Sequence, residues 1–93
     1  MEIKDNEFLR QFEATANDKL LSVEYSFQER KIFLTRVNIP DGVDEETFFL
    51  FLKEIMAVAR ERKLKVVPVH PKVAGFFRKN PKYKEMLPPG IRI

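Results

Sequence analysis

One stretch of the sequence, residues 44–80, constrains the fold more than any other. It contains a long apolar helix, DEETFFLFLKEIMAVARERK, then a short strand, LKVVPVH, and a second helix, PKVAGFFRK. Asp44 is a good N-cap, and Glu45 and Glu46 complement the positive end of the helix dipole. Because a helix separates the strand at 64–69 from the strand before it, we expect these two strands to pair in parallel.

The residues before this stretch predict three strands in an antiparallel meander. Asn17-Asp18 and Glu29-Arg30 supply the turn chemistry. Alternation predicts the faces of the strands, with one set of side chains on each face. The alternating sets are Phe8, Arg10 and Phe12 against Leu9, Gln11 and Glu13; Leu21, Val23, Tyr25 and Phe27 against Ser22, Glu24 and Ser26; and Phe33, Val37 and Ile39 against Leu34 and Arg36. The expected fold class is α+β, a mixed and mostly antiparallel sheet with a long helix and a shorter second helix packed on it.

Three prolines refine the secondary structure predicted for the second half of the chain. Pro68 lies inside the strand at 64–69 and cannot donate to a ladder, so it belongs on a sheet edge or where two strands splay apart. Pro71 suits the first position of the second helix, and Asn80-Pro81 ends it.

Length and composition exclude several classes of function. Ninety-three residues make one domain, residues 1–93, with nine Phe to build its core. The absence of Cys excludes disulfides and thiolate chemistry, and the single His70 argues against a zinc site. The N-terminus MEIKDNEF has no apolar signal core, and the longest apolar run is too short to cross a membrane. We therefore expect a cytoplasmic protein with no metal and no membrane contact.

The charge is divided unevenly along the chain. Residues 1–54 hold seven Lys and Arg against twelve Asp and Glu, whereas residues 55–93 hold ten against two. The basic half suits an anionic partner, but basic residues also simply solvate helices, and both interpretations stay open.

With these residues placed, the last third of the chain resembles the small single-domain N-acetyltransferase-like proteins of the GNAT superfamily. Those proteins typically read Val-x-Pro-x-Cys-Pro-x-Val, then Tyr-Ile, a basic residue and His-Pro-x-Tyr. This chain has VVPVHPKV at 66–73 and FFRKNPKY at 76–83. More loosely, Leu34-Thr35-Arg36-Val37 resembles the family's His-Thr-x-Val strand, and Glu24-Tyr25 its Leu-x-Tyr strand.

The resemblance implies an N-acetyltransferase that binds acetyl-CoA and transfers its acetyl group to an amine. The sheet would splay between the strands at 32–39 and 64–69, and the pantetheine arm would enter that gap. The implied coenzyme-binding residues are Val37, Gly42, Val43, Asp44, Val69 and Tyr83; the implied amine-binding residues are Thr35 and Arg36. His70 stands where the family has Cys, and its imidazole makes it the candidate catalytic base, because imidazole titrates near neutrality. An alternative stays open: His70 caps the helix that begins at Pro71, or is a half-buried polar residue at the end of the strand. Lys63, Lys65, Lys72, Arg78 and Lys79 would offset the phosphates.

The chain departs from the family pattern at three sites, and His70 in place of Cys is one of them. The Gly-rich loop that holds the pyrophosphate is replaced by PDGVDEE at 40–46, with one Gly and four carboxylates. The family's Tyr, a proton donor to the leaving thiolate, falls on Phe76, which has no proton to donate. These departures leave an alternative open: a catalytically degenerate domain of the same fold that binds a protein or a small ligand. Nucleic-acid binding is a third hypothesis, but no motif supports it and the Phe residues read as core.

Overall fold

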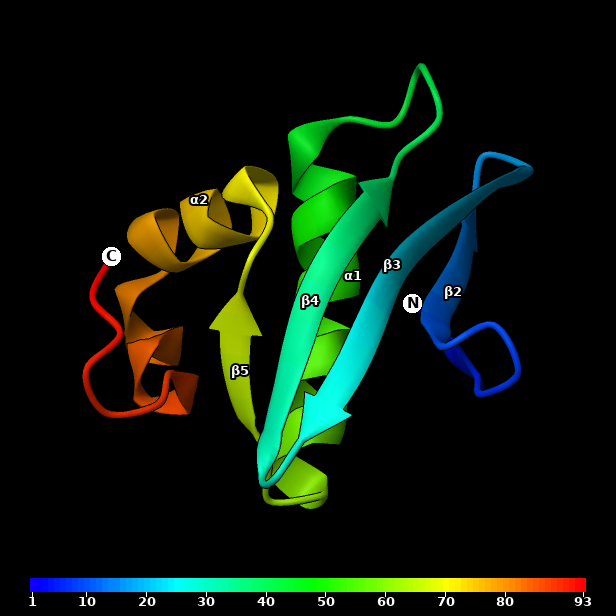
Figure 1. The fold of residues 1–93 in the computed structure, drawn as a ribbon. Coiled ribbons are helices and arrows are strands. Elements are labelled where there is room, and N and C mark those ends of the chain that lie inside the picture. Colours follow the sequence, from blue (N-terminus) through cyan, green and yellow to red (C-terminus); the bar gives the residue numbers. More distant parts are fainter.

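A computed structural model describes all of residues 1–93. Its sheet is built from β1 (Lys4–Asn6), β2 (Gln11–Ala16), β3 (Lys19–Gln28), β4 (Lys31–Asn38) and β5 (Lys65–Pro68). Helix α1 (Glu45–Glu61) connects β4 to β5, and α2 (Pro71–Lys79) and the 3-10 helix η1 (Pro81–Met86) follow β5. Figure 1 shows the sheet in front and α1 behind it.

The five strands lie in sequence order, β1-β2-β3-β4-β5. The first four are antiparallel to their neighbours, and β5 is parallel to β4. This arrangement confirms the predicted α+β class, the mixed and mostly antiparallel sheet, and the parallel pairing across the helix. A parallel pair needs a long connection between its strands, and α1 supplies it.

The N-terminal strands differ from the prediction. Residues 8–13 were expected to form one strand, but β1 ends at Asn6, the chain turns, and β2 begins at Gln11. Phe8 lies in this turn with 94% of its surface exposed, and Arg10 ends the turn with φ +53°. The alternating pattern at 8–13 therefore crossed a hairpin, because the turn residues happen to continue the apolar alternation of β2.

A β-bulge interrupts the pairing of β3 with β4. Glu24 pairs with Arg36, whereas the next residue of β3, Tyr25, pairs with Leu34. Thr35 is therefore the extra residue, and its hydroxyl donates a 3.2 Å hydrogen bond to the carbonyl oxygen of Glu24. An inserted residue shifts the alternation of the bulged strand by one position.

Because of the bulge, the side chains of β4 are divided between the two faces of the sheet differently from the prediction. Ile32 and Leu34, before the bulge, are buried in the core, and Val37 and Ile39, beyond it, pack against the same core. Phe33 was predicted to share a face with Val37 and Ile39, which is wrong: it is half-buried and lies outside that core. The sequence does not reveal the bulge, since apolar side chains occur at both the odd-numbered and the even-numbered positions of β4.

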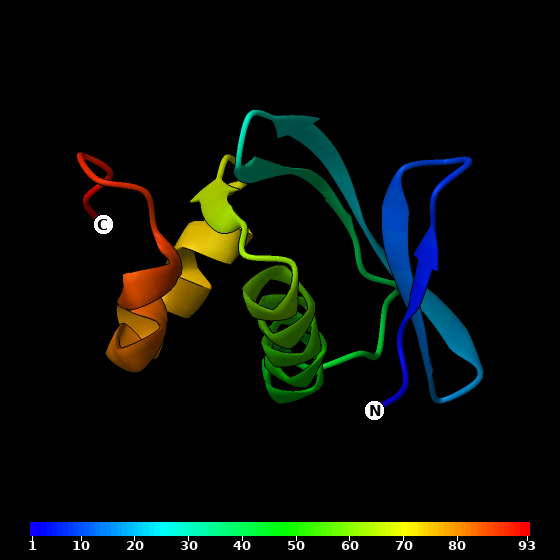
Figure 2. The ribbon, with the colours of Figure 1, turned by 90° about the horizontal axis from the view of Figure 1, so that it is seen from below.

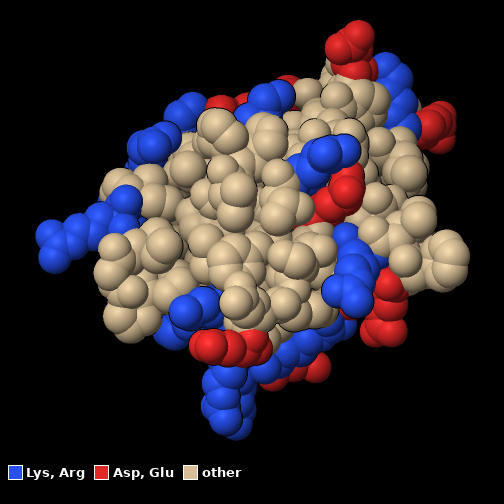
Figure 3. Space-filling view, viewed as in Figure 1, with Lys and Arg blue, Asp and Glu red and all other residues tan.

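Both helices cover the same face of the curved sheet, as the view from below shows (Figure 2). The side of α1 that meets the sheet is fully apolar and consists of Phe48, Phe51, Leu52, Ile55, Met56 and Ala59. Helix α2 adds Val73, Phe76 and Phe77 to this core. The opposite face of the sheet has no helix on it, and uncharged residues fill most of its middle, with charged groups mainly at the rim (Figure 3). No helix is both long enough and apolar enough to cross a membrane.

Strands β4 and β5 run together only over their first half. The pairing extends from Lys31 opposite Lys65 to Leu34 opposite Pro68, and the amide of His70 then donates to the carbonyl oxygen of Leu34 at 3.3 Å. Beyond this point β4 continues to Asn38 without a partner on that side, while the chain after β5 turns away into α2. The two strands therefore diverge, and Figure 1 shows the widening gap between their upper ends.

Pro68 fits this geometry as predicted, because β5 is an edge strand. The amide of Lys65 donates to the carbonyl oxygen of Arg30 across the parallel pair at 3.0 Å. Amides alternate in direction along a strand, so the nitrogen of Pro68 faces away from β4. No ladder hydrogen bond is lost by placing a proline there.

The end of α1 sets where β5 begins. The amide of Leu64 donates a 2.8 Å hydrogen bond to the carbonyl oxygen of Ala59, and the amide of Lys63 donates a 3.0 Å hydrogen bond to the carbonyl oxygen of Arg60. These two bonds form a Schellman motif around Lys63, which has φ +60°. A side chain with a Cβ is strained in this left-handed conformation, which usually belongs to glycine.

We predict that Lys63→Gly stabilises the protein by about 0.5–1 kcal/mol, because relief of the left-handed strain exceeds the extra entropy of glycine in the unfolded chain. Glu61→Gly is the matched control: Glu61 is the last residue of α1, is exposed and forms no ion pair, so glycine there should destabilise by a similar amount. Urea unfolding of both variants measures the difference. Equal destabilisation by the two substitutions would contradict this description of the helix end.

Candidate functional site

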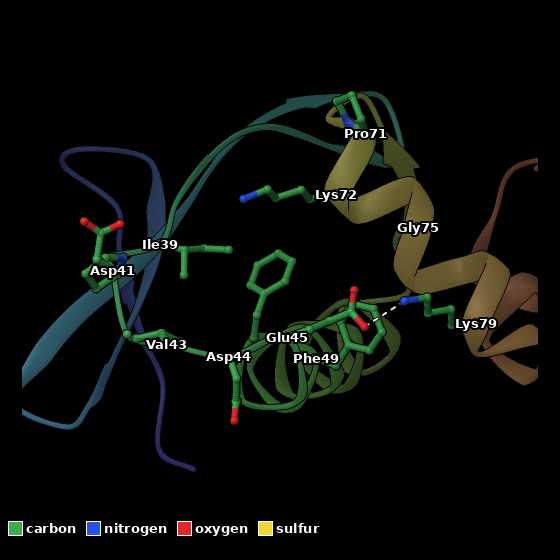
Figure 4. A pocket seen from close by; sticks show the side chains of 13 residues that line it. Ile39, Asp41, Val43, Asp44, Glu45, Phe49, Pro71, Lys72, Gly75 and Lys79 are labelled. Carbon is green, nitrogen blue, oxygen red and sulfur yellow. Dashed lines mark hydrogen bonds and ion pairs between the residues drawn. The ribbon is translucent and has the colours of Figure 1, made fainter.

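A pocket of about 550 Å³ lies where β4 and β5 separate. Its walls are the loop at residues 39–45, the start of α1 with Phe48 and Phe49, and one side of α2 with Pro71, Lys72, Gly75 and Lys79. Figure 4 shows these side chains around a common space, with Ile39 and Lys72 reaching into it from opposite sides. The volume is within the range of sites that bind small molecules.

The loop between β4 and α1 forms one wall of the pocket. The amide of Val43 donates to the carbonyl oxygen of Pro40, and Gly42 has φ +89°, as the third residue of such a turn often requires. The amino group of Lys19, at the start of β3, donates a 2.6 Å hydrogen bond to the carbonyl oxygen of Asp41. The loop is thus closed by its own backbone hydrogen bond and held to β3 by the side chain of Lys19.

Asp44 is the N-cap of α1, as predicted, and its carboxylate accepts a 2.8 Å hydrogen bond from the amide of Thr47. Hydrogen bonds from the side chain and then the backbone of Thr47 lower the pKa of Asp44 below its usual value. In Figure 4 this carboxylate points away from the space between Lys72 and Glu45. An anion at the start of α1 is therefore already supplied by the chain itself.

The remaining charges of the pocket come from opposite walls. Glu45 of α1 forms a 2.7 Å ion pair with Lys79 of α2, which also lies 5.9 Å from the centre of the Phe49 ring. Lys72 extends into the pocket without an ion-pair partner (Figure 4). With Asp41 and Asp44, the lining carries three carboxylates and two amino groups.

His70 is the N-cap of α2. Its Nδ1 accepts a 3.1 Å hydrogen bond from the amide of Lys72, and Pro71 occupies the first helical position, as predicted. The Nδ1 lone pair is occupied by this bond, which leaves the proton of the neutral ring on Nε2. His70 can take a proton from a substrate only if this capping bond is released.

The position of the family's tyrosine is part of the core. Phe76 is fully buried, and its ring centre lies 5.2 Å from those of Phe49 and Tyr83 and 5.5 Å from that of Phe77. Tyr83, on η1, is half-buried in this aromatic cluster and does not line the pocket. Edge-to-face and tilted pairs of this kind stabilise a core, so Phe76 connects α1, α2 and η1.

The predicted residues on and beside the strands do not line the pocket. Val37 packs against the core, and Val69 is more than half exposed just after β5. Thr35 is the bulge residue, and Arg36 lies 3.9 Å from Glu24 in an exposed ion pair.

Of the predicted coenzyme-binding residues, the structure brings Gly42, Val43 and Asp44 into the pocket lining. Of the five basic residues expected near the phosphates, only Lys72 and Lys79 line it. Gly75 was missed, although a glycine in the middle of a helix is itself a signal, because it costs helix stability.

A second polar cluster holds the sheet edge to the end of α1. The hydroxyl of Tyr25 donates to Asp5 on β1, and the other oxygen of Asp5 lies 2.9 Å from the guanidinium of Arg62. Burial, followed by the hydrogen bond to Asp5, raises the pKa of Tyr25 above its usual value. None of these three residues lines a pocket that could hold a ligand, so we interpret the cluster as structural.

Comparison with known proteins adds no assignment: no family model and no curated protein matches the chain. The structure also has no cluster of three or more His, Asp or Glu side chains placed to hold a metal ion. The pocket and the residues that line it are therefore the basis of the function proposed below.

We predict a pH-dependent stability difference between the wild type and Asp44→Asn. The folded pKa of Asp44 is lowered, so its charge stabilises the fold above the unfolded pKa near 4 and stops doing so as the pH falls through the folded value. Asparagine also caps helices but does not titrate. The wild type should melt at a higher temperature than the variant at pH 7, and the gap should close by pH 2. A gap independent of pH would contradict the assignment.

Substitution of His70 separates its cap role from any proton-transfer role. His70→Ala should destabilise the protein by about 1 kcal/mol, whereas His70→Asn should keep most of the stability because asparagine is a good N-cap. Thermal and urea unfolding measure both variants. Equal loss in the two variants would show that the hydrogen bond to Lys72 contributes little.

Proposed function

We propose that this protein is a GNAT-like domain that binds acetyl-CoA in the pocket between the diverging ends of β4 and β5. The observation that supports this most directly is the position of the pocket. It is lined by the residues that follow β4 and by α2, which follows β5, and β4 itself has no partner on its β5 side beyond Leu34. An extended pantetheine arm carries amide groups, and unpaired strand backbone is a natural partner for them.

The proposed chemistry is direct transfer of the acetyl group to an amine. The amine nitrogen attacks the thioester carbonyl, the C–S bond breaks, and the coenzyme leaves as a thiolate that takes up a proton. Backbone amides of β4 are the proposed donors to the carbonyl oxygen, since fixed donors stabilise the charge that develops there. Thr35 and Arg36 are the proposed contacts to the amine.

Proton transfer is the step for which this chain is least equipped. His70 is the proposed base, and it acts only when its Nδ1 releases the amide of Lys72. Phe76 offers no proton for the leaving thiolate and is buried away from the pocket. Water is the proposed proton donor in place of a tyrosine.

These same observations favour a second candidate, a domain of this fold that binds the coenzyme or another acyl ligand without turnover. In that case His70 serves only as a cap and Phe76 only as core. The two candidates share the pocket and differ in whether an amine is consumed. Steady-state release of free thiol from acetyl-CoA in the presence of a panel of amines distinguishes them, with His70→Asn as the variant that keeps the cap but removes the imidazole.

The first test is calorimetric titration of acetyl-CoA into the wild type, Glu45→Gln and Glu46→Gln. Glu45 lines the pocket and neutralises Lys79, whereas Glu46 is the adjacent exposed carboxylate outside the lining. An exposed charge interaction is worth up to about 1 kcal/mol, so Glu45→Gln should raise the affinity by about fivefold or less. Glu46→Gln should change it by a smaller factor.

Two results would contradict the proposal. One is the absence of binding to the wild type and to Glu45→Gln at millimolar coenzyme. The other is an equal gain from both substitutions, which would indicate a general charge effect rather than binding in the pocket. The measurement should be made at low ionic strength, because salt screens exposed charges.

A further inference from the structure

One side of α2 faces the pocket with a regular spacing of residues. Lys72, Gly75 and Lys79 lie at positions i, i+3 and i+7, which share one face of a helix, and all three line the pocket. Figure 4 shows Gly75 on the helix between the two lysines. The centre of this wall is therefore bare helix backbone with an amino group on each side.

Neither conformation nor packing explains the glycine at position 75. Of the three glycines only Gly42 and Gly90 have positive φ, so Gly75 has an ordinary helical backbone that any residue can adopt. A Cβ built at Gly75 meets no atom within 4 Å, so no neighbour requires its absence. A helical glycine without a side chain costs stability, and here the only space it leaves open is the pocket.

The two lysines are placed for separate anionic groups. Seven residues of α-helix span about 10 Å, so the two side chains start on either side of Gly75 and each can bind its own anionic group. Lys72 has no ion-pair partner, and Lys79 is held by Glu45 from the opposite wall. The start of α1 is less suited to a phosphate, because the Asp44 carboxylate occupies its amides.

We propose that this side of α2, and not the start of α1, is the phosphate-binding wall of the pocket. Its ligand carries two phosphate-type groups, one for each lysine, with the chain between them passing over Gly75. The inference rests on the proposed coenzyme site and specifies it: the pyrophosphate and the 3′-phosphate of a coenzyme A-type ligand are the two groups. Lys72 is free to bind at once, and Lys79 exchanges Glu45 for phosphate.

The three glycines allow a direct test by NMR, because glycine amides resonate in their own region of a ¹H–¹⁵N spectrum. Gly75 reports on the α2 wall, Gly42 on the α1 loop, and Gly90 lies outside the pocket lining. Titration with inorganic pyrophosphate, and separately with coenzyme A, should move the Gly75 signal to saturation and leave Gly90 in place. Gly42 should move with coenzyme A only.

Variants then test the wall itself. Lys72→Gln and Lys79→Gln should each weaken coenzyme A binding by about three- to fivefold at low salt, and Lys82→Gln, an exposed lysine outside the pocket lining, is the matched control. Dephospho-coenzyme A, which lacks the 3′-phosphate, should bind more weakly than coenzyme A to the wild type. One of the two lysine variants should lose that preference.

Gly75 gives the sharpest contrast between folding and binding. Gly75→Ala should raise the melting temperature by about 4 °C, because alanine is the better helix former and has room there. Gly75→Leu should fold as well but fill the space over the helix, and binding should be lost. Unchanged binding by a folded Gly75→Leu variant overturns the inference.

The outcomes separate this inference from the proposed function. If coenzyme A binds but moves Gly42 and not Gly75, the phosphates lie at α1, so the inference is wrong and the coenzyme site stands. If pyrophosphate moves Gly75 but coenzyme A does not bind, the wall is a phosphate site and the proposed function is wrong. No shift of Gly75 with either probe overturns the inference.

Discussion

The packing of α1 against the curved sheet is the interaction on which the rest of the structure depends. Six of its side chains are buried, and burial of each large apolar side chain stabilises the fold by about 1.5–3 kcal/mol. Because α1 begins after β4 and ends before β5, its position fixes where both strands lie. The Schellman motif at Lys63 directs the chain back to the sheet, and β5 pairs with the first half of β4.

The pocket follows from the way this parallel pair ends. β5 ends at Pro68, and two residues later His70 caps the start of α2. In contrast, β4 continues to Asn38, toward the start of α1. Residues that terminate and start elements thus form the walls of the site. The aromatic cluster around Phe76 keeps α2 at a fixed distance from α1, so the width of the pocket is set by core packing rather than by the loop.

The charges of the site are mostly balanced by the chain itself. The Asp44 carboxylate caps the start of α1, and Glu45 forms an ion pair with Lys79. The amino group of Lys19 donates a hydrogen bond to a backbone carbonyl oxygen of the loop. Lys72 is the lysine of the lining that has no such partner, which makes it the natural first contact of an anionic ligand. On the proposed function, affinity is a competition between ligand phosphates and internal carboxylates, and it should fall with salt.

Much of the fold could be predicted because local chemistry determines it. Asp44 as N-cap, Pro71 at the first turn of α2, the turn at Asn17-Asp18 and the edge position of Pro68 each follow from what the residue can or cannot bond. The bulge at Thr35 could not be predicted, because both faces of β4 are apolar there. The hairpin after β1 was missed because exposed Phe8 continues an apolar alternation.

The candidate site was less predictable than the fold. Gly42, Val43 and Asp44 line the pocket, and it was the resemblance to the family's Gly-rich loop that assigned them to a coenzyme site. The sequence offered the cap role of His70 as an alternative to catalysis, and the structure shows the capping bond. Glu45 and Lys79 are thirty-four positions apart in sequence, so their ion pair depends on the packing of α1 against α2. The glycine at position 75 was visible in the predicted helix, but only the structure shows the open space beside it.

The central claim is that a ligand uses the β4 backbone left unpaired where the strands diverge. Residue-resolved hydrogen exchange of the backbone amides, with and without acetyl-CoA, tests this most directly. We expect slower exchange in β4 beyond Leu34 and at the start of α2 when the coenzyme is bound, because these amides become hydrogen-bonded or covered. Binding of the coenzyme with unchanged exchange over this part of β4 would contradict the claim, because the ligand would then lie elsewhere on the molecule.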